Sequence, residues 1–174
     1  DAMQREEVTG FAGVPSTFAI LLNRSNFKSC SLPSLRYITQ AGGPMPHSMA
    51  YEILNAVPHA KLYIMYGQTE ASARLSYLPP DDLHRKHGSV GKAIPGVLLQ
   101  VVNERNEMVK PGETGEIVAE GENIMAGYWE KPEETAKALR NGRLYTGDLA
   151  TVDEEGYIYI LSRKSDMIKS GAHR

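Results

Sequence analysis

The strongest constraint on the fold is a regular alternation of short apolar runs and helical periodicity between residues 8 and 65. The expected elements are strand, helix, strand, helix and strand, at residues 8–14, from Pro15, at 35–39, from about Pro46, and at 61–65. Parallel strands cannot be joined by a tight turn and need a crossover connection, usually a helix. This order therefore predicts an α/β fold in which a partial parallel sheet carries helices.

The second half of the chain has a different pattern, in which apolar and polar residues alternate with a period of two. The candidate strands lie at residues 97–102, 115–119, 143–145, 150–152 and 157–161. Turn-forming segments at 103–107 and 153–156 predict antiparallel hairpins, and one helix is expected over residues 132–140. We expect an α/β subdomain over residues 1–80, followed by a small antiparallel β-barrel-like subdomain over residues 81–162.

Composition excludes several classes of function. The 174 residues include 19 Lys and Arg against 21 Asp and Glu, so the net charge is −2 and a basic surface for nucleic acid is not expected. No apolar run approaches the roughly 20 residues that a transmembrane helix needs. The single cysteine, Cys30, excludes a disulfide framework within the chain and favours a reducing, cytoplasmic location.

A glycine turn follows the second expected strand. Gly42, Gly43 and Pro44 stand between that strand and a helix, at the carboxyl edge where open α/β sheets bind ligands. Glycines there allow a flat ring or a phosphate to approach the backbone closely. The alternative is a tight strand-to-helix turn without a ligand, which is the commoner origin of such a tripeptide.

A polar cluster follows the third expected strand, in the order Tyr66-Gly67-Gln68-Thr69-Glu70. At the edge of a parallel sheet it would present an aromatic face, a hydroxyl and a carboxylate to one crevice. Glu70 suits Mg²⁺, which commonly binds one or two carboxylates together with substrate phosphates, and the Thr69 hydroxyl suits a phosphate oxygen. The alternative interpretation is a capped turn with a solvated glutamate.

One acidic and one basic residue in the second half suggest a sugar site. Asp148 follows Gly147 at the expected end of a strand, and its two carboxylate oxygens match the two hydroxyls of a ribose. Arg163 follows the strand at 157–161 and is suited to grip the same ribose or a phosphate. An aspartate that closes a hairpin and an ordinary surface arginine are the alternatives.

Other common catalytic centres have no support in the sequence. The five histidines show no metal-ligand spacing, and the chain has neither a His-Glu-x-x-His nor a Cys-x-x-Cys pair. A Gly-x-Ser-x-Gly elbow is also absent. Zinc chemistry and hydrolytic triads are therefore not expected, and Cys30, without an evident partner base, is interpreted as structural.

Taken in order, the motifs resemble those of one known family. They are Tyr66-Gly67-Gln68-Thr69-Glu70; Gly88-Ser89-Val90-Gly91-Lys92 with Pro95-Gly96; Gly115-Glu116-Ile117 with Gly127-Tyr128-Trp129; Tyr145-Thr146-Gly147-Asp148; and Arg163-Lys164-Ser165-Asp166-Met167-Ile168-Lys169-Ser170-Gly171. Together they resemble the adenylate-forming, or AMP-binding, superfamily of acyl-CoA synthetases, nonribosomal-peptide adenylation domains and luciferases. The resemblance runs over almost the whole chain.

The resemblance implies an ATP-dependent reaction in two steps. A carboxylate attacks the α-phosphorus of Mg·ATP to give an acyl-adenylate and pyrophosphate, and a thiol, usually that of coenzyme A, then displaces AMP. The implied partners are a small carboxylic acid, ATP and coenzyme A as co-substrate, with Mg²⁺ as the metal. Positioning and charge neutralisation are what such phosphoryl chemistry requires of a protein.

The resemblance also implies which residues touch the nucleotide. In chain order these are Gly42, Gly43, Pro44, Tyr66, Gly67, Gln68, Thr69, Asp148 and Arg163. Tyr66 would stack on the adenine, and the Gly42 loop would line the adenine and acyl pocket. Thr69 would contact phosphate and Glu70 would bind Mg²⁺, so these two are the expected catalytic residues. Asp148 and Arg163 would hold the ribose hydroxyls.

The end of the chain resembles the hinge between the large and small domains of this family. Ser165 stands at the hinge position, where Asp or Lys is commoner, so its side-chain contacts would differ from the family's pattern. Residues 163–174 would be the hinge and the start of a truncated small domain, with Lys169 and Arg174 toward the coenzyme A or phosphate side. The family's phosphate loop and its C-terminal catalytic lysine have no counterpart here, so we expect a middle fragment that is inactive alone.

Two alternatives stand beside an acyl-CoA synthetase. One is a peptide-synthetase adenylation domain, although residues 166–171 resemble CoA ligases more closely. The other is a nucleotide-binding module without catalysis, and the presence of Glu70 and Asp148 argues against it. The acid is not identified, but the small residues at 71–73 favour a long or bulky acyl chain, such as a fatty acid.

Overall fold

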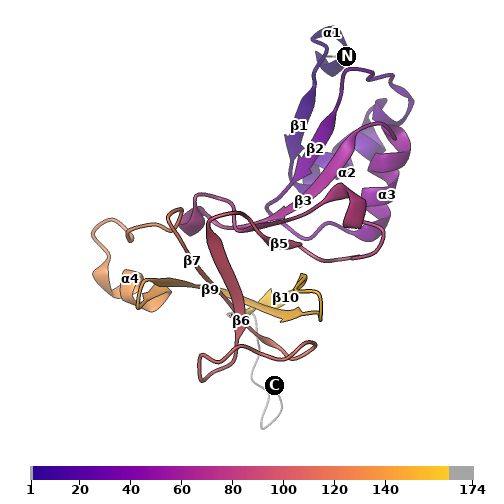
Figure 1. Ribbon diagram of the computed structural model, residues 1–174. Coiled ribbons are helices and arrows are strands. Elements are labelled where there is room, and N and C mark those ends of the chain that lie inside the picture. The colour runs from indigo at the N-terminus through magenta and orange to yellow at the C-terminus, as the bar shows by residue number, and fades with distance from the viewer. Residues whose placement is uncertain (1, 165–174) are drawn as a thin grey trace. The chain divides into compact units, whose positions relative to one another are not determined.

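The computed structural model describes residues 2–164, which form two compact units (Figure 1). Of these residues, unit 1 contains 2–66 and 77–88, and unit 2 contains 67–76 and 89–164. Each unit has its own buried apolar residues and its own sheet pattern.

Unit 1 is built on three parallel strands, with β2 between β1 and β3. Its elements are α1 (Ala2–Arg5), β1 (Gly10–Gly13), α2 (Pro15–Arg24), the 3-10 turn η1 (Phe27–Ser29), β2 (Tyr37–Gln40), α3 (His47–Ala56), β3 (Lys61–Tyr66) and the 3-10 turn η3 (Pro80–Asp82). A further strand, β4 (Ser76–Leu78), spans the point where the chain returns to unit 1. The expected strand and helix order and the parallel sheet are confirmed.

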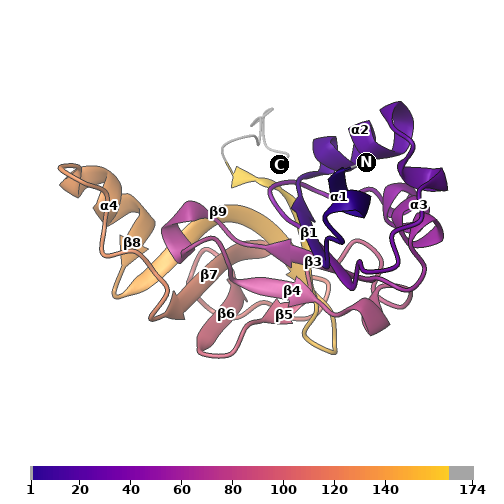
Figure 2. The same cartoon turned by 90° about the horizontal axis from the view of Figure 1, so that it is seen from above.

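The apolar faces of two helices cover one side of these strands. Pro15 occupies the first turn of α2, where its missing N–H and fixed φ are tolerated. Phe18 of α2 and Ile53 of α3 are fully buried, as are Ile38 of β2 and Leu62 of β3. Figure 2 shows α2 and α3 on the same side of the strands. The apolar residues that recur every 3.6 positions in the helices and every two positions in the strands therefore pack together in one core.

Unit 2 is an antiparallel sheet with the strand order β10-β9-β7-β6. Its elements are the 3-10 turn η2 (Thr69–Ala71), β5 (Lys92–Ala93), β6 (Val97–Val102), β7 (Gly115–Gly121), α4 (Pro132–Ala138), β8 (Leu139–Arg140), β9 (Arg143–Val152) and β10 (Ile158–Arg163). The long strand β9 is strongly curved (Figure 2). Ile117, Val118, Leu144 and Ala150 have no exposed surface and form the centre of this sheet's core. The expected antiparallel second half is confirmed.

One strand replaces the two that were expected at residues 143–145 and 150–152. Gly147 adopts a φ of +74°, which a glycine reaches without steric cost, and the chain continues as β9 through this point. The pairing of β9 shifts register against β7 between Glu116 and Val118, and against β10 between Ile160 and Ser162. Such bulges bend a strand without ending it. Asp148 therefore lies inside a strand, and the expectation that it follows a strand end is wrong.

The helix expected over residues 132–140 is shorter than predicted. It ends at Ala138, and Leu139 and Arg140 form β8, which pairs with Leu144 and Arg143 of β9. Residues 141 and 142 both have positive φ, at 52° and 77°, which is the geometry of a tight two-residue hairpin turn. An Asn-Gly pair favours that turn strongly enough to begin a hairpin where a helix end was expected.

The described residues contain no helix that is both long enough and apolar enough to cross a bilayer.

Candidate functional site

The polar cluster after β3 forms a tight loop in unit 2, from Gly67 to Arg74. A β-carbon on Gly67 would lie 2.5 Å from the carbonyl oxygen of Ala73, so only glycine fits this approach of two backbone segments. The loop is closed by a hydrogen bond of 3.0 Å from the Ala73 amide to the Gln68 carbonyl. Ser72 and Ala73 both have positive φ. The loop thus holds a strained shape, with Thr69 and Glu70 at the start of η2.

The carboxylate of Glu70 has one hydrogen-bond donor among the described residues. The Tyr128 hydroxyl donates to Glu70 Oε1 at 2.6 Å. This bond, followed by desolvation and the negative charge of Glu70, raises the pKa of Tyr128 above 10, while the charge of Arg163 opposes the rise. Tyr128 is therefore a neutral donor near pH 7.

The loop backbone is bound by a second segment of unit 2, residues 123–128. The Asn123 side-chain amide donates to the carbonyls of Ala71 and Arg74, at 3.0 and 2.8 Å. The Ser72 hydroxyl donates to the Asn123 carbonyl at 3.0 Å, and the Met125 amide donates to the Glu70 carbonyl at 2.8 Å. Four hydrogen bonds therefore join residues 70–74 to residues 123–125.

Asp148 and Arg163 form an ion pair across neighbouring strands. They are register partners of β9 and β10, and Arg163 Nε lies 2.9 Å from Asp148 Oδ1. The Asp148 side chain is 8% exposed and that of Arg163 is 51% exposed, so the pair presents its guanidinium to solvent while its carboxylate is held inside. Arg163 Nη1 also donates to the Thr146 carbonyl at 3.3 Å.

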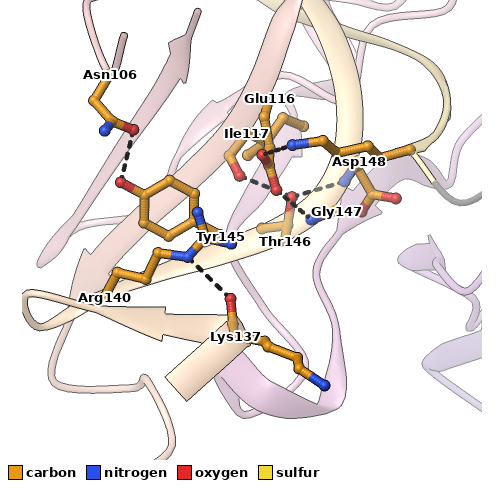
Figure 3. A network of polar contacts seen from close by, with 10 residues as sticks. Asn106, Glu116, Ile117, Lys137, Arg140, Tyr145, Thr146, Gly147 and Asp148 are labelled. Atoms are coloured by element: carbon orange, nitrogen blue, oxygen red, sulfur yellow. Dashed lines mark hydrogen bonds and ion pairs between the residues drawn. The ribbon is translucent and has the colours of Figure 1, made fainter. Parts of the chain in front are cut away.

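A polar network fixes the backbone amides of Gly147 and Asp148 (Figure 3). Thr146 Oγ1 accepts from the Asp148 amide at 3.1 Å and donates to the Ile117 carbonyl at 2.8 Å. Glu116 Oε1 accepts from the Gly147 amide at 3.1 Å, and its Oε2 pairs with Lys164 Nζ at 2.9 Å. The Glu116 carboxylate therefore connects the backbone of β9 next to Asp148 with Lys164, the residue that follows Arg163.

The glycine turn at Gly42 lies in unit 1. Gly42 has a φ of +80°, and a β-carbon there would meet Val14 Cγ1 at 3.2 Å. The side-chain amide of Gln40, which is fully buried, donates to the Gly43 carbonyl at 2.7 Å. The turn is therefore held in one shape by a buried amide of the preceding strand.

The expected site residues are divided between the units. Gly42, Gly43, Pro44 and Tyr66 belong to unit 1, whereas Gly67, Gln68, Thr69, Glu70, Asp148 and Arg163 belong to unit 2. Tyr66 ends β3 and is 8% exposed. The expected hinge residue Ser165 and the basic residues Lys169 and Arg174 lie outside the described residues.

Several residues that shape the site had no role in the sequence-based expectation. They are Glu116, Asn123, Tyr128, Thr135 and Lys164. Three of them, Glu116, Tyr128 and Lys164, stand inside sequence motifs that carry the family resemblance. The motifs indicate that these positions matter for the site. Their hydrogen bonds with Glu70 and Gly147 could not be predicted, because those bonds depend on the fold.

Unit 1 also brings together three histidines that have no ligand-like spacing in the sequence, His47, His84 and His87. The rings of His47 and His87 have centroids 4.0 Å apart, and the Tyr51 hydroxyl lies 2.6 Å from His84 Nδ1. Desolvation, and then the charges of His87 and His84, lower the pKa of His47 below 6.5. Within residues 2–164 no group of three or more His, Cys, Asp or Glu side chains is arranged to hold a metal ion.

Comparisons with known proteins identify relatives of the whole described chain. A family model described as AMP-binding enzyme matches residues 1–129. The indoleacetate–CoA ligase of Aromatoleum aromaticum is 37% identical over 172 residues, which cover 98% of this chain and 33% of that protein. A long-chain-fatty-acid–CoA ligase of Escherichia coli is 36% identical over 161 residues, which cover 92% of this chain and 28% of that protein.

A solved structure shares the fold. The o-succinylbenzoate coenzyme A synthetase of Bacillus subtilis, in complex with ATP and magnesium ion, matches with a TM-score of 0.87 at 32% identity. The match covers 99% of this chain and 35% of that one. The chain thus spans about a third of the length of the curated relatives it matches. The matched family is the one that the sequence motifs resemble.

Proposed function

This chain belongs to the AMP-binding enzyme family, and from that premise we propose that it is the central part of an AMP-forming carboxylate–CoA ligase. The proposed enzyme adenylates a carboxylic acid with ATP and then transfers the acyl group to coenzyme A. The observation that carries the proposal lies in unit 2, where Glu70 has one hydrogen-bond donor among the described residues, Tyr128, and where Asp148 and Arg163 form an ion pair across neighbouring strands.

The Asp148–Arg163 pair is proposed to hold the ribose. A buried carboxylate whose backbone is held at the Gly147 and Asp148 amides is a rigid acceptor for hydroxyl groups, and a half-exposed guanidinium carries further N–H donors. Rigidity matters because substrate positioning in such reactions replaces much of the entropic cost of bringing two reactants together.

Glu70 and Thr69 are proposed to face the phosphates. Mg²⁺ in nucleotide enzymes is commonly held by one or two carboxylates plus phosphate oxygens, and Glu70 fits as such a carboxylate. Within residues 2–164, its Oε2 has no hydrogen-bond partner, while Oε1 is held by Tyr128. Bound there, the ion would neutralise phosphate charge during displacement of pyrophosphate. The protein's part is to keep Glu70 oriented and Thr69 at the start of η2.

The remaining site residues belong to the same proposal. The Gly42 turn and Tyr66 are proposed to line the adenine and acyl pocket, Ser165 to be the hinge, and Lys169 and Arg174 to belong to the coenzyme A or phosphate side of the small domain. A cytoplasmic location is part of the proposal and is supported by the free thiol of Cys30.

The carboxylic acid is proposed only as a class. Relatives named for indoleacetate and for long-chain fatty acids are 37% and 36% identical to this chain, so overall similarity does not separate aromatic from aliphatic acids. Ala71 is fully buried beneath its loop, whereas Ser72 and Ala73 are exposed. Small side chains there are compatible with an extended or bulky acyl group.

The test is turnover by the complete protein that contains this chain. AMP release is measured with ATP, coenzyme A and a panel of aromatic, medium-chain and long-chain acids, for the wild type and for Glu70→Gln. We expect acid-dependent AMP release and thioester formation with at least one acid, and a loss of more than about tenfold in Glu70→Gln. Thioester formation with a peptidyl-carrier thiol but not with coenzyme A, after normal adenylation, would contradict the proposed acceptor.

A further inference from the structure

We propose that Tyr128 is a positioning residue for Glu70, holding the carboxylate in the orientation that receives the divalent cation of the bound nucleotide. This inference rests on the proposed function and adds to it a residue and a supporting segment, residues 123–135. Three sets of contacts in unit 2 carry it: the bond to the carboxylate, the bonds to the loop that carries it, and the bonds that fix Tyr128 itself.

The bond to the carboxylate leaves the charge of Glu70 in place. A phenol donates one hydrogen bond without neutralising the carboxylate, whereas Lys or Arg would compete with a cation for it. The bond engages Oε1 at 2.6 Å, and among the described residues Oε2 has no partner. Glu70 is half-buried and its side chain has several rotatable bonds, so one fixed oxygen removes much of its rotamer freedom.

The loop that carries Glu70 is attached to the same segment as Tyr128. The Met125 amide donates to the Glu70 carbonyl, and the Asn123 amide bridges the carbonyls on either side of the loop, at Ala71 and Arg74. The main chain and the side chain of Glu70 are therefore held by residues only three positions apart, Met125 and Tyr128. Movement of the segment would move both together.

Tyr128 is itself fixed by α4. Its backbone amide donates to Thr135 Oγ1 at 2.9 Å, and Thr135 Oγ1 donates to the Lys131 carbonyl at 2.8 Å. Gly127 has a φ of +153°, and a β-carbon there would lie 2.8 Å from Thr135 Cγ2. The Thr135 side chain thus packs against the backbone of Gly127 and Tyr128, and this explains why glycine precedes the tyrosine.

The test removes only the hydroxyl, as Tyr128→Phe in the complete protein. Mn²⁺ serves as the probe, because its binding in the presence of a non-hydrolysable ATP analogue can be measured by electron paramagnetic resonance without turnover. We expect Mn²⁺ to bind at least about tenfold more weakly than in the wild type, the effect of losing one hydrogen bond to a charged group. AMP binding without metal is expected to be unchanged.

The matched control is Tyr159→Phe. In the same unit, the Tyr159 hydroxyl donates to a carboxylate oxygen, Asp153 Oδ2, at 3.2 Å, so this variant loses the same type of bond away from Glu70. It should bind Mn²⁺ as the wild type does. Equal Mn²⁺ affinity in the wild type and Tyr128→Phe would overturn the inference.

A second variant separates positioning from packing. Tyr128→Leu removes the ring as well as the hydroxyl, so a purely structural role predicts that Phe restores metal affinity and Leu does not. The inference predicts that both variants bind Mn²⁺ weakly while thermal stability falls only in Leu. If the wild type itself shows no nucleotide-dependent Mn²⁺ binding, the proposed function fails. If the wild type binds Mn²⁺ and Tyr128→Phe binds it equally well, only the positioning role of Tyr128 fails.

Discussion

Arg163 and Asp148 face each other as register partners of β10 and β9, with Nε and Oδ1 2.9 Å apart. The two side chains differ sharply in exposure, at 51% and 8%. A carboxylate so well buried must be compensated, because desolvation disfavours the charged form unless a partner and hydrogen bonds offset it. The pair is therefore a structural unit as well as the proposed ribose site.

The first prediction concerns that dual role. Asp148→Asn and Arg163→Gln should each weaken AMP binding by about tenfold or more in the complete protein, measured by calorimetry. Arg163→Gln should also destabilise by about 1–3 kcal/mol in urea unfolding, because it removes a cationic partner of a buried carboxylate. The double variant should cost less stability than the sum of the two single variants. Additive losses would mean that the two side chains do not interact.

The second prediction concerns Glu116, which accepts a hydrogen bond from the Gly147 amide next to Asp148. Glu116→Gln keeps an oxygen that can accept from the Gly147 amide but loses the charge pair with Lys164, whose side chain is 55% exposed. That pair is screened by solvent, so Glu116→Gln and Lys164→Met should each cost below about 1 kcal/mol. Glu116→Ala also removes the acceptor of the Gly147 amide and should lower the free energy of unfolding by about 1–2 kcal/mol. Urea unfolding checks the order, and equal losses for Gln and Ala would contradict it.

The third prediction uses the close backbone approach at Gly67. In Gly67→Ala the new β-carbon would lie 2.5 Å from Ala73 O and 2.7 Å from Ala73 C, and backbone atoms cannot rotate away as a side chain does. The loop that carries Thr69 and Glu70 must therefore shift, and adenylate formation should fall by more than about tenfold, since small misplacements of catalytic groups are costly.

Gly112→Ala is the control for Gly67→Ala. Gly112 has a φ of +84°, and a β-carbon there would meet nothing within 4 Å, so the substitution strains the backbone without a clash. It should lower stability by about 1 kcal/mol and leave adenylate formation intact. If Gly112→Ala impairs catalysis as much as Gly67→Ala, the effect of Gly67→Ala comes from general destabilisation rather than from the shape of the loop.

Local patterns predict most of the fold. The five elements expected in unit 1, β1, α2, β2, α3 and β3, follow from apolar periodicity and from Pro15 and Pro46 at helix starts, because these signals act within a few residues. Two strands were expected in place of β9 because Gly147 is locally typical of an interruption. Pairing on both sides with β7 and β10 outweighs that local signal, and only the sheet supplies this pairing.

The site was only partly predictable for a similar reason. The polar residues at strand ends, such as Thr69 and Glu70, can be found from sequence because their chemistry is unusual next to apolar strands. Tyr128 could not be paired with Glu70, because a hydrogen bond between segments so far apart depends on how β7 and α4 place the connecting loop. The grouping of His47 with His87 was missed for the same reason.

The last prediction concerns pH and the histidines of unit 1. Since the pKa of His47 is lowered in the folded protein, the unfolded chain binds the proton more readily. Stability should therefore be unaffected by this group well above pH 6.5, fall as pH drops through the unfolded value near 6.5, and reach its full loss below the folded pKa. Urea unfolding at pH 7.5 and 5.5 should show a smaller drop for His47→Gln than for the wild type.

Ring-proton NMR provides the direct check on the same prediction. The His47 resonance should titrate with a pKa below 6.5, and it should move upward in His87→Gln, because a neighbouring positive charge that opposes protonation is removed. The same variant relieves part of the desolvation, since the two rings are in contact, and both effects act in the same direction. A His47 pKa above 6.5 would reverse the sign of the argument and predict stabilisation at low pH instead.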